Sequence, residues 1–182
     1  MTWNDTYLAL FDRCVTTYQN GNHDFTTYFT PTELEFLAGI GCQARELFDF
    51  VEDFCNDGEP SPSTALLIAA VRRDYFLTVQ HGQPSGPCLT YDDLPTFGDE
   101  LAGLSYLPRI LVKARAKLRG ELDPDMMIGC GGDRKFLTPH GDIHPADFLR
   151  WVWATGSDDQ KLAAWVIDGM KKVLPMATSR MA

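Results

Sequence analysis

The sequence lacks the features that mark membrane proteins, secreted proteins and nucleic-acid binders. No apolar run approaches the about 20 residues that span a bilayer, and the start, MTWNDTYLALFDR, has no basic, apolar secretory signal. Only 16 lysines and arginines stand against 25 aspartates and glutamates, a formal net charge of −9. Because anionic surfaces repel such a chain, we expect a cytoplasmic protein that binds neither nucleic acid nor membranes.

Paired cysteines are lacking too. The five cysteines are odd in number and no two have CxxC spacing; they are Cys14, Cys42, Cys55, Cys88 and Cys130. This pattern is typical of reduced thiols that pack as small apolar residues. It disfavours a structural zinc site, and we expect no resident metal or organic cofactor.

The period-two alternation of half-buried strands is missing over any useful length. Helix signals occur instead: Thr30, Pro31 and Glu33 form a capping box with proline at the first helical position, and Ser61 with Pro62 repeats the start. We predict an all-α fold, a compact bundle of about six to eight helices. A short strand pair within residues 127–136 is left open.

A stretch rich in proline and glycine, residues 83–98, interrupts the helical pattern. We divide the chain there into an N-terminal helical half, residues 1–82, and a C-terminal helical half, residues 99–175. Residues 176–182 are expected to form a loose tail. The two parts are either one compact domain or two interlocking halves. Similar Thr-Pro and helix patterns in both parts hint at duplication, although ordinary likeness between helical hairpins explains them better.

Two arginines stand out on the most apolar predicted helix. Arg72 and Arg73 follow the apolar run Ala65 to Val71, where a buried charge needs a partner or a ligand. We predict that they help to bind an anion, together with the nearby Tyr75. The structural alternative is an ion pair between helices, with Asp74, Asp49 or Glu52 as the acid.

A second basic cluster lies on the predicted helix at residues 107–119. Arg109 and Lys113 are four residues apart and share a helical face, with Arg115 close by. In an acidic protein, the convergence of these groups with Arg72 would create a local site for a carboxylate or a phosphate.

The glycine-rich segment at residues 129–134 could bring backbone amides close to a ligand. Asp133 is a candidate general base and Arg134 a candidate ligand-binding residue. A tight turn and a helix cap are the plain alternatives. Cys130 would need a base to act as a nucleophile, and His140 is the only local candidate.

Histidines supply the remaining candidates. His140, Asp142 and His144 lie within five residues of one another, but their spacing matches no recognised metal motif, and His144 stands where a helix cap would. His81 follows the apolar helix. It could meet the C-terminus of that helix or face the anion site.

Three segments carry a family resemblance: LAGLSYLPRILVKARAKLRGEL, CGGDRKFL and DFLRWVWATGSDDQKLAAWV. Residues 95–174, roughly, resemble the bacterial family known as domain of unknown function 5069, with the first half as a helical extension. The resemblance implies a small, mainly helical domain and supplies no activity. The Gly131-Gly132 pair and the PHGDIHP segment depart from the family pattern.

These observations support a hypothesis of a small cytosolic enzyme that acts on an anionic metabolite by acid/base chemistry. Asp133, His140 or His81 would move the proton. The ligand-binding candidates are Arg72, Arg73, Tyr75, Arg109, Lys113, Arg115 and Arg134. The alternative is a non-catalytic module that binds a small ligand or another protein. A homodimer is also left open.

Overall fold

The computed structural model describes residues 2–85 and 88–178, with side chains through residue 170. Within these ranges the chain forms eight α-helices, which confirms the predicted all-α bundle. They are α1 (Trp3–Gln19), α2 (Pro31–Gly39), α3 (Ala44–Asp57), α4 (Pro62–Thr78), α5 (Leu107–Arg119), α6 (Gly131–Leu137), α7 (Pro145–Thr155) and α8 (Asp159–Thr178). Two short 3₁₀ turns, η1 (Phe25–Thr27) and η2 (Tyr91–Asp93), lie in the connections.

The helix starts follow the local signals of the sequence. The Thr30 hydroxyl accepts a hydrogen bond from the Glu33 amide, and the Glu33 carboxylate accepts one from the Thr30 amide, so the predicted capping box is formed at α2. The Ser61 hydroxyl caps α4 by accepting a hydrogen bond from the Thr64 amide. The basic helix α5 ends at Gly120, which has a left-handed conformation with φ +72°. Glycine adopts this conformation without a steric penalty.

A short strand pair forms, but outside the segment in which one was left open. β1 (Glu100–Leu101) pairs antiparallel with β2 (Leu104–Ser105). Ala102 and Gly103 between them both have positive φ, at 53° and 77°, as tight hairpin turns require. The strand pair that was left open at residues 127–136 does not form, because helix α6 begins at Gly131.

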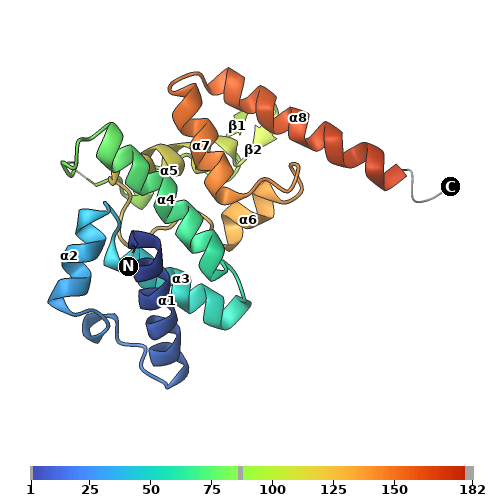
Figure 1. Ribbon diagram of the computed structural model, residues 1–182. Helices are drawn as coiled ribbons and strands as arrows, with labels where there is room; N and C mark the ends of the chain where they lie inside the picture. Colours follow the sequence, from blue (N-terminus) through green and yellow to red (C-terminus); the bar gives the residue numbers. More distant parts are fainter. Residues whose placement is uncertain (1, 86–87, 179–182) are drawn as a thin grey trace.

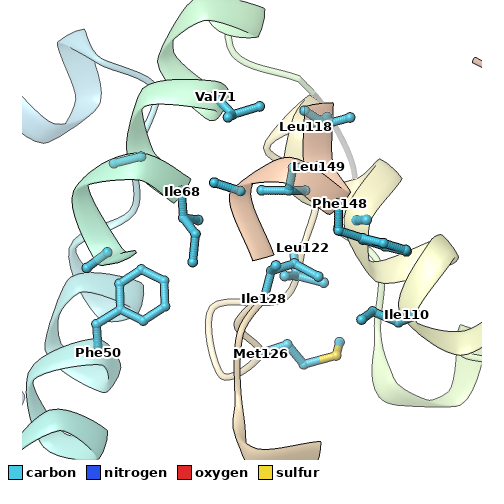
Figure 2. Packing of buried hydrophobic residues seen from close by; sticks show 14 of the residues in the cluster. Phe50, Ile68, Val71, Ile110, Leu118, Leu122, Met126, Ile128, Phe148 and Leu149 are labelled. Atoms are coloured by element: carbon cyan, nitrogen blue, oxygen red, sulfur yellow. The ribbon is translucent and has the colours of Figure 1, made fainter. Parts of the chain in front are cut away.

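Helix α4 occupies the middle of the bundle and packs against α1, α3, α5 and α7 (Figure 1). Buried side chains from both predicted halves meet in one core (Figure 2). Phe50 of α3 and Ile68 of α4 come from the first half, and Ile110 of α5 and Phe148 of α7 come from the second. The loop after α5 adds Ile128 to the same cluster.

Helix α8 packs along α7 and then extends away from the rest of the molecule (Figure 1). It also passes close to the loop before α7, since a Cβ on Gly141 would lie 2.8 Å from the Gly169 carbonyl carbon. The helix continues past Pro175 to Thr178, and the rest of the expected loose tail, residues 179–182, lies outside the described residues.

Candidate functional site

A cavity of about 460 Å³ opens between helices α3 and α5. Apolar side chains form part of its lining, and seven charged residues surround the space. The apolar group comprises Leu94, Phe97, Met126 and Met127, and the charged residues are Arg45, Asp49, Glu52, Asp53, Arg109, Lys113 and Asp125. A concave site with an apolar surface and a few convergent polar groups is typical of small-molecule binding.

A row of basic residues lies on α5, and its first two members, Arg109 and Lys113, form the cationic wall of the cavity. Arg109, Lys113 and Lys117 are spaced four residues apart, so they lie along one face of the helix. Lys117 is buried in an ion pair with Glu46 of α3. Lys113 is buried in an ion pair with Asp133, with 2.8 Å between Nζ and Oδ2. The two inner cations of the row are therefore neutralised by the fold.

Arg109 differs from the other two cations. Among the described residues, no carboxylate forms an ion pair with it. Its guanidinium instead donates a hydrogen bond to the Pro95 carbonyl at 2.7 Å and lies 4.3 Å from the centroid of the Phe97 ring. These contacts hold the side chain at the cavity without cancelling its charge, as expected of a group that binds an anion.

The acidic wall faces this row from α3. Asp49, Glu52 and Asp53 line the cavity, and Asp125 joins them from the loop before α6. Arg45 lies 3.1 Å from Asp49 and 3.4 Å from Asp125, so a single guanidinium serves both carboxylates. Two of the four carboxylates therefore share one cation, Arg45.

Asp49 is the residue of this wall whose protonation is most affected by its surroundings. Its side chain is 13% exposed, and burial raises the pKa of the carboxyl from 3.8 to about 7. The charge of Arg45 opposes this change, whereas the charges of Glu52, Glu46 and Asp125 add to it. A carboxyl with a pKa near 7 in a cavity is suited to general acid/base catalysis.

Asp49 was considered only as an ion-pair partner from the sequence, but a signal for its position exists. Glu46, Asp49 and Asp53 have the spacing i, i+3, i+7, which places three acids along one side of an amphipathic helix. All three meet basic residues: Glu46 meets Lys117, Asp49 meets Arg45, and Asp53 lies 3.5 Å from Arg134.

The predicted base Asp133 is buried beneath the cavity and has no exposed surface. Its carboxylate accepts hydrogen bonds from Lys113, from the Tyr106 hydroxyl at 2.8 Å and from the Gly129 amide at 3.0 Å. This network anchors Tyr106, which lines the cavity with an unusual φ of +72°. The structure thus gives Asp133 the surroundings of a structural residue, in contrast to the predicted role.

The glycine-rich segment folds as the first turn of α6 and not as an open loop. Cys130 caps the helix and lines the cavity, with its Sγ 3.5 Å from the Nζ of Lys113. His140 is not beside it: the His140 ring stacks on Phe136 and its Nδ1 contacts the Phe136 carbonyl at 2.5 Å. The contact with His140 that a nucleophilic Cys130 would need is therefore absent.

The two arginines of α4 are not part of the cavity. Arg72 is buried, and its guanidinium donates hydrogen bonds to the carbonyls of Gly41 and Leu118, each at 2.8 Å. It therefore ties α4 to the end of α5, and burial lowers its pKa. Arg73 lies over the ring of Trp3 and 3.5 Å from Asp74. The predicted convergence of Arg72 with Arg109 does not occur.

Two further predicted residues, Tyr75 and Arg115, line a separate cavity of about 410 Å³ between α4, α5 and α7. Arg115 is engaged there with the Gly156 carbonyl and with Asp159. Arg134 donates to the Gly129 carbonyl at 2.6 Å, next to the acidic wall. His81 is exposed in the turn after α4.

The histidine segment before α7 has local roles. His144 caps α7 through the Ala146 amide, as its position in the sequence predicted. In the part of the chain that the structure describes, no three His, Cys, Asp or Glu side chains come together as a metal site. The helices of that part include none with the length and apolar character to cross a membrane.

The cavity combines residues from two parts of the chain, and a comparison with protein families distinguishes them. Residues 97–177 match the model of DUF5069, a domain of unknown function. This confirms the resemblance in the second half. No curated protein and no solved structure matches the chain. Arg109, Lys113 and Cys130 lie within the DUF5069 match, whereas the acidic wall on α3 lies in the N-terminal part.

Proposed function

We propose that the protein is a small enzyme that binds an anionic metabolite in the cavity between α3 and α5 and transforms it by acid/base chemistry. The observation that supports this most directly is the state of Arg109. It lines the cavity, is held by the Pro95 carbonyl and the Phe97 ring, and has no ion-pair partner among the described residues. A carboxylate or phosphate of the metabolite would supply that partner.

The acid/base step is assigned to Asp49. Its carboxyl lines the same cavity and has a pKa raised to about 7 by burial, so both protonation states are populated near neutral pH. This assignment replaces Asp133, whose oxygens are engaged with Lys113, Tyr106 and Gly129. It also replaces His81 and His140, which do not line the cavity.

Binding is tested by thermal shift and calorimetric titration of the full chain with small carboxylates and phosphates. Arg109→Gln should weaken the binding of an anionic hit about 10- to 100-fold, the effect of losing a charged hydrogen bond. Arg115→Gln is the matched control on the same helix, because Arg115 lies at the other cavity and pairs with Asp159. Equal affinity of the wild type and Arg109→Gln for every hit would refute the anion site.

Catalysis is tested separately from binding. The wild type and Asp49→Asn are incubated with the bound metabolite in deuterated water, and incorporation of deuterium into the metabolite is followed by NMR. We expect exchange with the wild type and its loss in Asp49→Asn, both measured at a metabolite concentration that saturates the protein. Binding without exchange or product in the wild type would favour the alternative, a non-catalytic ligand-binding module. The homodimer and the cytoplasmic location stay predictions from the sequence.

A further inference from the structure

The cavity carries opposite charges on opposite walls. The α5 side presents Arg109 and the neutralised Lys113, whereas the α3 side presents Asp49 and Glu52. Arg45 also lies on α3, where it pairs with Asp49, but Arg109 on α5 and Glu52 on α3 form no ion pair with the described residues. A ligand in this space meets a cation at one side and carboxylates at the other.

Carboxylates are in excess around the cavity. Three basic residues and four acids line it. Lys113 already has the buried Asp133 as its counter-ion and Asp53 has Arg134, which leaves two bases against three acids. Glu52 accepts a hydrogen bond from the Tyr18 hydroxyl at 3.2 Å, but it forms no ion pair with the described residues. A ligand with negative charge at both ends would be attracted by Arg109 and repelled by this wall.

A ligand with a protonated amine at the acidic wall would be attracted there and not repelled. The charge of Glu52 disfavours the ionised form of Asp49, and a cation between the two side chains would interact favourably with both carboxylates. Between the charged walls, the side chains of Leu94, Met126 and Met127 offer apolar contact. An aliphatic spacer fits that surface, since its methylene groups leave water on binding.

We propose that the substrate is dipolar, with an anionic group on Arg109, a protonated amine on Asp49 and Glu52, and a short aliphatic spacer between them. This identifies the substrate class of the proposed function and rests on it. The anionic group is a carboxylate or a phosphate, which Arg109 binds by the same bidentate chemistry. Amino acids with a terminal amine and their phosphate counterparts belong to this class.

The test is a calorimetric titration of the full chain at pH 7 with four-carbon probes that differ only in their end groups: 4-aminobutanoate, butanedioate, 1,4-diaminobutane and butanoate. The compound 3-aminopropyl phosphate adds the phosphate arm. We expect 4-aminobutanoate or 3-aminopropyl phosphate to bind at least about tenfold more tightly than the other three probes. The tighter of the two identifies the anionic group.

Two variants separate this proposal from the proposed function. Glu52→Gln should weaken the amino compounds and the diamine about tenfold and leave butanoate unchanged. Arg109→Gln should weaken every probe that carries an anion and leave the diamine unchanged. Glu121→Gln is the matched control, because Glu121 pairs with Arg119 away from the cavity.

The outcomes are distinct. If Arg109→Gln weakens the anionic probes but Glu52→Gln changes nothing, the anion site stands and the dipolar substrate is refuted. If butanedioate binds as tightly as the amino compounds, the dipolar substrate is also refuted. If none of the probes binds at about 10 mM, well above the concentrations at which enzymes meet their substrates, the dipolar substrate is refuted as well.

Discussion

The protonation of Asp49 can be tested without knowledge of the ligand, through its effect on stability. Asp49→Asn keeps the shape of the side chain and an oxygen that can accept a hydrogen bond from Arg45, but removes the titration. In the folded protein the pKa of Asp49 is about 7, against an ordinary value of 3.8. Since the folded value is the higher one, the native state binds a proton that the unfolded chain releases between these pH values.

The sign and size of the effect follow from this difference. The contribution of Asp49 to stability is most favourable below its unfolded pKa of 3.8 and is lost as pH rises through about 7. Each pH unit is worth about 1.4 kcal/mol, so the full interval corresponds to about 4 kcal/mol. About 3 kcal/mol of it falls between pH 5 and pH 9. The side chain is only 13% exposed, so screening by water reduces this value little.

The assay is urea denaturation of the wild type and Asp49→Asn at pH 5, 7 and 9. We expect Asp49→Asn to gain about 3 kcal/mol in free energy of unfolding relative to the wild type over this range. The other titrating groups cancel in the difference between the two proteins. Asp12→Asn, which removes an exposed carboxylate from α1, is the control for loss of charge alone. A difference that stays constant within about 1 kcal/mol would refute the raised pKa of Asp49.

Two substitutions test the contacts that support the site. Lys113→Met leaves the carboxylate of Asp133 buried without its cation, and urea denaturation should show a loss of about 3–5 kcal/mol; a loss below about 1 kcal/mol would contradict the structural role of the pair. Gly120→Ala places a Cβ 2.5 Å from Nη2 of Arg72 at a residue with φ +72°. It should lower the melting temperature more than Gly58→Ala, which has similar φ but open space around it; equal losses would contradict the contact with Arg72.

The sequence identified those parts of the fold that depend on local chemistry. The start of α2 follows from the pairing of Thr30 with Glu33, and the end of α5 follows from Gly120, because caps act within a few residues. The shared face of Arg109 and Lys113 likewise follows from helical spacing. These features need no knowledge of how distant segments meet.

Features that depend on tertiary contacts were missed. Helix α6 begins with two glycines, which argue for a loop, yet Asp133 in its first turn is fixed by Lys113 and Tyr106 from elsewhere in the chain. Arg72 was expected to help bind an anion, but its guanidinium donates hydrogen bonds to carbonyl groups of two other segments. Neither partner set lies near in the sequence, so neither can be deduced from spacing.

Two arginines on one helix differ in the partners that the fold gives them. Arg115 and Arg109 both extend from α5 in a chain with a net charge of −9, in which acids are abundant. Arg115 has Asp159 as its partner. Arg109 lies in a cavity that four carboxylates also line, and still forms no ion pair with the described residues. The Pro95 carbonyl and the Phe97 ring hold it away from them. A cation kept apart from nearby acids retains its charge for a ligand, and that restraint distinguishes a binding residue from a structural one.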